Sequence, residues 1–113
     1  MAAETITVLV KEPSKAPEMR KIRNELEALQ RNVGGYIETV TGTVHIEGKD
    51  VTVCVICDEE GRLKGKEPNC VLLGRSFVGD ILIVGVDGDE FTHIPMVYKE
   101  AKQLWPYLWE VNK

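Results

Sequence analysis

Three cysteines and two histidines are the side chains of this sequence best suited to bind a metal or to act as nucleophiles. Cys54 and Cys57 have the spacing of a zinc-binding pair, and Cys70, His45 and His93 are candidate further ligands. A zinc knuckle needs a turn that directs both thiolates toward one point. Cys54 and Cys57 instead lie in a β-branched run, where residues three apart face opposite sides of a sheet. We therefore expect structural cysteines and predict no metal, redox pair or cofactor.

Other catalytic patterns are weaker still. Neither histidine has a serine or cysteine at a spacing typical of a nucleophilic triad. The glycine-containing segments 61–66 and 85–89 lack the spacing of a P-loop or a dinucleotide fingerprint, so both are interpreted as turns. We therefore predict that the protein is not an enzyme and name no catalytic residue.

A long segment, residues 62–79, is the best candidate for binding a small ligand. It is rich in glycine and is predicted to be a loop with one helical turn near 69–73, and long loops in small domains are often functional. Asn69, Arg75 and Ser76 combine an amide, a guanidinium and a hydroxyl there, and Arg75 could pair either with an anionic ligand or with a surface carboxylate. The sequence does not decide between these two roles.

Aromatic side chains are concentrated near the C-terminus. Trp105, Tyr107 and Trp109 include both tryptophans of the chain. They could clamp the last helix onto the sheet, or they could form a patch for a partner or a second copy, because Trp and Tyr are frequent anchors of interfaces. Both alternatives stay open at the level of sequence.

Composition narrows the classes of partner. The chain has 113 residues, of which 43% are hydrophobic and 28% charged, as expected for one globular domain. Its net charge of −4 argues against nucleic acid as the main partner, since binding to phosphates depends on clustered cations. No apolar stretch approaches the roughly 20 residues that span a membrane, and no export signal is seen. We expect a cytoplasmic protein with reduced thiols and no membrane partner.

Hydrophobic periodicity predicts the first half of the fold. Residues 5–11 are apolar and β-branched, which predicts a buried strand, and 12–17 predict a loop. From Met19 to Val33 the apolar residues follow one helical stripe, and Gly34 or Gly35 supplies the left-handed residue that ends a helix.

The rest of the chain alternates between strands and turns. We predict strands at residues 36–40, 43–47, 51–57 and 80–86, with turns at 41–42 and 48–50. A final helix is predicted to begin near Pro95 after a cap at Thr92, and Pro106 should kink or split it. The order β-α-β-β-β-loop-β-α predicts a single α+β domain over residues 1–113. We expect a two-layer sandwich, with two helices on one face of a mixed, mostly antiparallel sheet of about five strands.

Four segments together resemble a known family. They are EPSKAPEMRKI, LEALQRNVGGYIETV, DEEGRLKGKEPN and GDILIVGVDGDEFTHI, and the resemblance runs from about residue 5 to residue 108. The family is the domain of unknown function 3846, found in bacteria, their phages and mobile elements. It has no established activity, so the resemblance implies a genomic setting but no catalytic residues.

Two features depart from the family pattern. Members often place an arginine after the asparagine that corresponds to Asn69, where this chain has Cys70. The segment TGTVHIEGKDVTVCVIC is longer than the usual connection before the acidic turn. A family ligand site around Asn69 would therefore be altered here.

The resemblance implies a small binding protein of phage or mobile-element origin. We expect its partner to be a protein or a second copy, and its role to include modulation of host or defence machinery. The alternative is a protein that binds or sequesters a nucleotide or another small anionic metabolite through Arg75 and Asn69.

Overall fold

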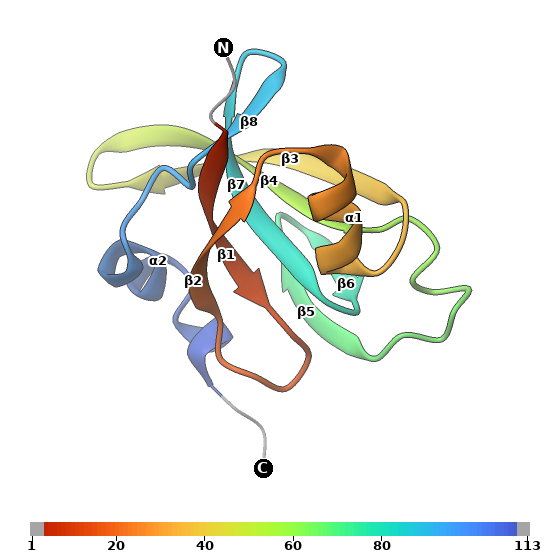
Figure 1. Cartoon of the computed structure of the whole chain (residues 1–113). Helices are drawn as coiled ribbons and strands as arrows, with labels where there is room; N and C mark the ends of the chain where they lie inside the picture. Colours follow the sequence, from red (N-terminus) through yellow and green to blue (C-terminus); the bar gives the residue numbers. More distant parts are fainter. Residues whose placement is uncertain (1–3, 111–113) are drawn as a thin grey trace.

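The computed structural model describes residues 4–110. Figure 1 shows an antiparallel sheet with helical segments packed against it. The elements, in chain order, are β1 (Thr5–Lys11), β2 (Glu18–Arg23), α1 (Leu26–Val33), β3 (Ile37–Ile46), β4 (Lys49–Asp58), β5 (Pro68–Leu72), β6 (Arg75–Val78), β7 (Ile81–Asp87), β8 (Glu90–Thr92), α2 (Tyr98–Leu104) and the 3-10 helix η1 (Pro106–Trp109).

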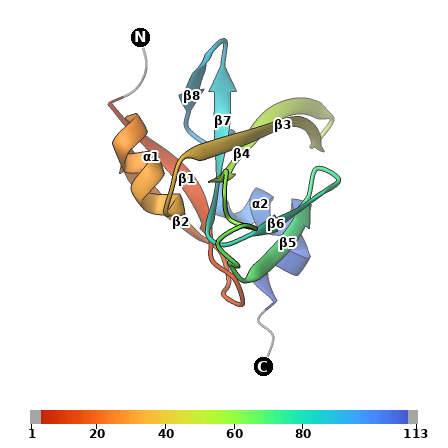
Figure 2. The same ribbon diagram turned by 90° about the vertical axis from the view of Figure 1, so that its right-hand side faces the viewer.

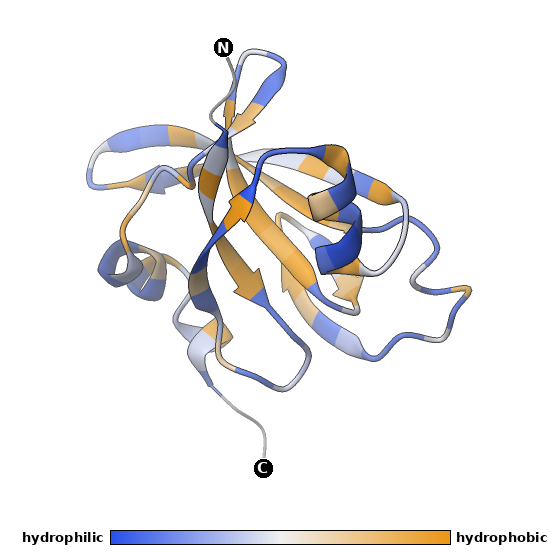
Figure 3. Ribbon diagram, viewed as in Figure 1, coloured by the Kyte–Doolittle hydropathy of each residue, from blue (hydrophilic) through white to orange (hydrophobic). Residues whose placement is uncertain are grey.

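The main sheet has the strand order β2-β1-β7-β4-β3, and β8 extends it by pairing with the end of β7. All of its pairs are antiparallel. Strands β1, β4 and β7 lie in its centre and carry the longest apolar runs, which Figure 3 shows as the most hydrophobic ribbons. The α+β class and the largely antiparallel sheet with two helices are therefore confirmed.

The two faces of the sheet are covered by different elements. On one face, Ile6, Val8, Leu82 and Val84 pack with residues of α1. On the other face, a second hydrophobic cluster joins the sheet to the β5–β6 hairpin, α2 and η1. The prediction that both helices share one face is wrong, because α1 and α2 lie on opposite sides of the sheet (Figure 2). Since strands buried on both faces need cover on both, the architecture has three layers.

The prediction of one helix from Met19 to Val33 is only partly right, because the first part of this segment is a strand. Residues Glu18–Arg23 form β2, which pairs with β1 along six residues, and only α1 is helical. Met19 contacts the cluster beneath α2, whereas Ile22 is buried in the cluster beneath α1. Apolar residues three apart, such as Met19 and Ile22, therefore also fit a strand whose two faces are both partly covered. Hydrogen bonding to the edge of β1 makes this segment a strand and not a helix.

The segment after the Gly-Gly corner contains two long strands instead of the three predicted. β3 and β4 pair in one continuous register over ten residues, and the turn falls at Glu47-Gly48, where both residues have positive φ. Gly42 lies inside β3 and makes no turn. A Cβ there would lie 2.9 Å from a methyl carbon of Leu73, so the glycine lets the tip of the β5–β6 hairpin approach the strand.

The predicted loop at residues 62–79 contains the hairpin of β5 and β6. Its turn is Leu73-Gly74, again with positive φ at both residues, and no helical turn occurs at 69–73. Phe77 and Leu72 are buried beneath it. Residues 59–67 connect β4 to the hairpin without a strand or helix, and residues 79–80 lead from β6 into β7.

The C-terminal prediction is confirmed at Pro106, which ends α2 and begins η1. Because proline cannot donate a backbone hydrogen bond, the helix divides there. The predicted cap is wrong: Thr92 belongs to β8, and α2 starts after Val97, whose N–H donates to Glu100 Oε1 at 3.1 Å. Among the described residues, no helix is both long enough and apolar enough to cross a bilayer.

The two leucines of α1 provide a matched test of how this helix packs. Leu29 is 3% exposed and Leu26 is 55% exposed. We predict that Leu29→Ala lowers the free energy of unfolding by about 3 kcal/mol, because it leaves a cavity against the sheet, whereas Leu26→Ala changes it by less than about 1 kcal/mol. Urea unfolding of both variants measures this difference, and equal losses would place α1 off the sheet.

Candidate functional site

Two hollows lie beside the β5–β6 hairpin. The first has a volume of about 390 Å³ and lies between β6 and the sheet strands β3 and β4. The second has a volume of about 550 Å³ and lies between β5, η1 and the end of β1. The hairpin, which the sequence predicted to be a binding loop, therefore lines both hollows: β6 lines the first and β5 lines the second.

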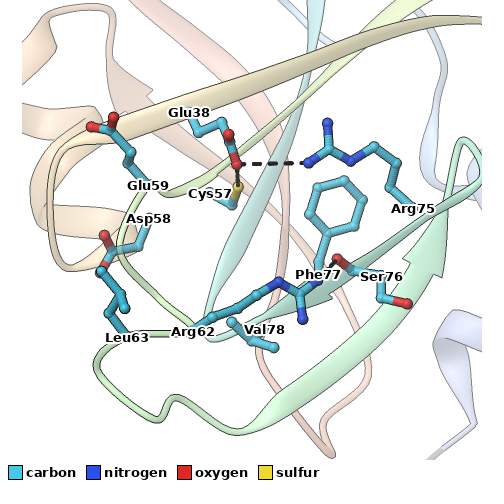
Figure 4. Close-up of a pocket in the computed structure, with 10 residues that line it drawn as sticks. All are labelled: Glu38, Cys57, Asp58, Glu59, Arg62, Leu63, Arg75, Ser76, Phe77 and Val78. Atoms are coloured by element: carbon cyan, nitrogen blue, oxygen red, sulfur yellow. Dashed lines mark hydrogen bonds and ion pairs between the residues drawn. The ribbon is translucent and has the colours of Figure 1, made fainter.

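The first hollow carries charges of both signs (Figure 4). Arg62 Nη2 donates to the backbone oxygen of Ser76 at 2.7 Å. Arg75 Nη2 lies 4.0 Å from Glu38 Oε1, and both side chains are about half exposed, so this contact is a weak surface pair. The two guanidinium groups could receive an anionic group, but Glu38 competes for Arg75.

Cys57 lies at the back of the first hollow. Its Sγ is 3.8 Å from Glu38 Oε1. Burial, reinforced by the Glu38 carboxylate, raises the pKa of the Cys57 thiol to about 11. The thiol therefore stays protonated near neutral pH, which makes it a poor nucleophile and a poor metal ligand.

Asp58 lines the same hollow and makes ion pairs with two lysines. Its side chain is 1% exposed, and Oδ2 lies 2.7 Å from both Lys64 Nζ and Lys66 Nζ. Oδ1 accepts a hydrogen bond from the backbone N–H of Glu60 at 2.9 Å. Burial alone would raise the pKa of this carboxyl, but the hydrogen bonds from the two lysines and from Glu60 outweigh it and lower the pKa to about 2.

The two lysines also end α1. Lys66 Nζ donates to the carbonyl of Val33 at 2.7 Å, and Lys64 Nζ donates to the carbonyl of Gly34 at 3.1 Å. Cations at the C-terminus of a helix satisfy its free carbonyls and complement its dipole. One buried carboxylate thus neutralises two cations that hold the helix end against the 59–67 connection.

The Gly-Gly corner fits around this cluster. Gly34 has a φ of +81° and ends α1, as the sequence predicts. A Cβ on Gly35 would lie 2.6 Å from Asp58 Oδ1 and 2.6 Å from Lys64 Nζ. The first glycine is therefore required by its backbone conformation, and the second by the space that the ion cluster occupies.

The second hollow contains a buried cation. Lys11 is only 4% exposed, and its Nζ donates to the backbone oxygen of Glu12 at 2.7 Å. Burial lowers the pKa of Lys11, and the nearby Cys70 and Glu12 partly oppose this effect. Cys70 also lines the hollow, and burial raises the pKa of its thiol to about 11.

The structure separates the three residues predicted to bind one ligand. Arg75 and Ser76 line the first hollow, whereas Asn69 lines the second. The Nδ2 group of Asn69 is also occupied, because it donates to Lys11 O at 2.9 Å and to Gly79 O at 2.7 Å. The structure therefore does not bring Arg75 and Asn69 together in one hollow.

Sequence reasoning missed Arg62 and Lys11 as lining residues. Arg62 was assigned to a turn, and Lys11 ends an apolar run in a position where a lysine normally reaches solvent. No spacing pattern links either residue to the hollow that it lines, so the sequence contained no signal for them.

The C-terminal aromatic residues divide between core and surface. Trp105 is 7% exposed and belongs to the hydrophobic cluster, which fits the first of the two alternatives, a clamp of the last helix onto the sheet, and leaves this residue unavailable to a partner. Tyr107 is 46% exposed, and its hydroxyl donates to Val71 O at 2.8 Å. Trp109 is half-buried, and its Nε1 donates to the hydroxyl of Tyr98 at 3.0 Å. Tyr98 joins this surface although the sequence did not indicate it.

The candidate metal ligands do not converge. Cys54 and Cys57 belong to hydrophobic clusters on opposite faces of the sheet, as their spacing in a strand predicts. His45 lies on the β3–β4 hairpin, 2.9 Å from Asp50, and Nδ1 of His93 accepts the N–H of Thr7 at 3.0 Å. Within residues 4–110, no group of three or more His, Cys, Asp or Glu side chains is placed to hold a metal ion.

The Asp58 cluster predicts a strong effect of one isosteric substitution. Asp58→Asn leaves both lysines without their counter-ion, so we expect the free energy of unfolding to fall by about 3 kcal/mol. The neighbouring exposed acid gives the control, since Glu59→Gln should change the stability by less than about 0.5 kcal/mol. Chemical denaturation measures both, and similar losses would show that Asp58 has no special role.

The same carboxyl predicts how stability depends on acid. Its pKa is about 2 in the folded protein against an ordinary 3.8, so its contribution is complete above pH 3.8 and is lost as pH falls through about 2. A shift of this size corresponds to about 2 kcal/mol. Unfolding measured from about pH 6 down to about pH 2 should show the difference between wild type and Asp58→Asn shrinking. A constant difference over that range would contradict the assignment.

Comparison with known proteins places the chain in a family without identifying a function. No curated protein matches the sequence. No solved structure matches it either. The family model of the domain of unknown function DUF3846 matches residues 6–105, which include the Gly-Gly corner, the Asp58 cluster and the hairpin between the two hollows. The chain therefore belongs to the DUF3846 family.

Proposed function

We propose that this protein is a non-enzymatic binding protein that acts through contact with another protein. The observation that supports this function best is a set of aromatic and apolar side chains on β5, α2 and η1, in two contacting pairs, Tyr98 with Trp109 and Tyr107 with Val71, which we call the aromatic surface. Val71, Tyr98 and Tyr107 are 57%, 47% and 46% exposed, respectively. Exposed aromatic groups next to an apolar side chain are typical of the energetic centre of a protein interface.

The aromatic surface is ordered by contacts within the protein. The rings of Tyr98 and Trp109 meet edge to face, with centroids 5.5 Å apart and planes at 88°. The hydrogen bond from Tyr107 to the backbone of Val71 ties η1 to β5. Side chains fixed before binding lose little conformational entropy when a partner arrives, which favours affinity.

The outer edge of β3 gives a second route to association. This strand pairs with β4 on one side only, within the described residues, and it contains no proline or lysine along its ten residues. The other edge strand, β2, carries Arg20, Lys21 and Arg23, and such charges discourage edge-to-edge pairing. Pairing at β3 is the geometry that we propose for any self-association.

The cellular role is proposed on the family resemblance. We propose a cytoplasmic accessory protein of a phage or mobile element, with a host protein, including a component of defence machinery, as its partner. The net charge of −4 disfavours nucleic acid as that partner.

The second candidate function is the binding of a small molecule, because the hairpin lines two hollows that are large enough for a small ligand. In the first hollow, Arg62, Arg75 and the hydroxyl of Ser76 could bind a nucleotide or another anionic metabolite. The Glu38 carboxylate beside Arg75 weighs against a ligand of high negative charge.

The protein-binding proposal is tested by quantitative affinity capture from host lysate. We predict that the wild-type chain retains a defined partner, and that Tyr107→Ser combined with Tyr98→Ser reduces capture at least about tenfold, since central aromatic residues contribute about 2 kcal/mol or more each. Leu26→Ser is the matched control, because Leu26 is equally exposed but lies on α1, on the opposite face of the sheet.

Two outcomes would overturn this function. One is capture that Leu26→Ser reduces as much as the double tyrosine variant does. The other is the absence of any retained protein, together with thermal stabilisation by nucleotides or phosphorylated metabolites that Arg75→Ala abolishes. The second result would establish the small-molecule function, because a saturating ligand adds about 2.7 kcal/mol at a hundred times its dissociation constant.

A further inference from the structure

Lys11 and Asp58 are the buried charged residues of the part of the chain that the structure describes, and their surroundings differ. Asp58 has two ammonium groups within 2.7 Å. Lys11 has no carboxylate within 4.0 Å among residues 4–110, and the hydrogen-bond partner of its Nζ is one backbone oxygen. The buried cation of this region therefore has no direct ion-pair partner, and Glu12 and Cys70 act on it only at longer range.

From this contrast we infer that the second hollow is a binding site for a small monocarboxylic acid, whose carboxylate pairs with Lys11. The inference goes beyond the proposed protein contact and does not depend on it. Removing an ammonium group from water without a partner costs several kcal/mol, and a bound anion would offset that cost.

Neighbouring acids act on Lys11 without forming an ion pair with it. Glu12 contributes its backbone oxygen to Lys11, but its carboxylate lies 3.5 Å from the exposed ammonium of Lys15. Glu110 lines the mouth of the hollow and is exposed, without an ion pair to Lys11. Lys11 thus lines the hollow without an ion pair from the described residues.

The lining indicates the class of ligand. Lys11 is the only cation among the residues around the hollow, and Glu110 adds a negative charge, so a phosphate ester or a polyanion would be poorly neutralised. Pro68, Val71 and Leu108 supply apolar walls. One carboxylate on a short apolar body matches both features, and a volume of about 550 Å³ is sufficient for it.

Asn69, which lines the same hollow, has a buried polar atom without a partner. The Oδ1 atom of Asn69 is buried and accepts no hydrogen bond from the described residues, although Nδ2 of the same amide makes two. A buried acceptor without a donor is costly.

The site is tested by titrating isotope-labelled protein with benzoate and butyrate, and with the neutral isosteres benzamide and butyramide, while recording amide chemical shifts. We expect saturable shifts confined to residues around the second hollow, and binding of each acid at least about tenfold tighter than of its amide. Lys11→Met should abolish the preference for the acid, whereas Lys15→Met, which removes an exposed cation nearby, should bind as the wild type does.

Three results would overturn the inference. They are the absence of saturable binding up to about 50 mM of either acid, equal binding of acid and amide, and unchanged acid binding in Lys11→Met. Inorganic phosphate serves as a further probe, and phosphate binding tighter than that of both carboxylates would also contradict the assigned ligand class.

The stability of the free protein gives an independent readout. Because Lys11→Met replaces an uncompensated buried cation by an apolar side chain of similar length, we expect its midpoint of thermal unfolding to rise above that of the wild type when no ligand is present. A lower midpoint would show that the protein itself already satisfies the ammonium, and the proposed site would then be excluded.

Discussion

The buried Asp58 carboxylate is the interaction on which the arrangement of this protein depends most. It lies at the end of β4, and its two lysine partners come from the connection that follows. Those lysines also reach the last carbonyls of α1. A helix on one face of the sheet and a hairpin on the other are thereby joined through one charge cluster. Removing the carboxylate would leave Lys66, whose side chain is 23% exposed, without its counter-ion, whereas Lys64, at 40% exposed, keeps more access to water.

The same cluster explains why two hollows lie beside one hairpin. Lys66 passes over Gly34 and Gly79, where a Cβ would lie 2.8 Å and 2.7 Å from its atoms. This packing fixes where the chain enters β5 and leaves β6. The two strands of the hairpin then border different hollows, one lined by arginines and the other by a buried lysine. The strand of the hairpin to which a residue belongs therefore determines which hollow its side chain lines.

Local patterns in the sequence predicted those parts of the fold that local chemistry determines. Gly34 ends α1, Pro106 divides the C-terminal helix, and Cys54 and Cys57 face opposite sides of their strand. The failures were non-local. Residues 18–23 have the apolar spacing of a helix, but they form a strand because they pair with the edge of β1. Residues 62–79 have the composition of a loop, but they contain a hairpin because Phe77 packs into the hydrophobic core. The site followed the same rule, because Asn69 and Arg75 are near in sequence but lie on strands that face different hollows.

The most direct test of this account is the coupling energy between Asp58 and Lys66, measured by unfolding the variants Asp58→Asn and Lys66→Met, their combination and the wild type. Because the carboxylate and the ammonium are 2.7 Å apart and the carboxylate is buried, the two substitutions should be strongly non-additive. We predict a coupling energy above about 1 kcal/mol. Additive losses, with a coupling energy near zero, would show that this ion cluster does not hold the helix end and the hairpin together.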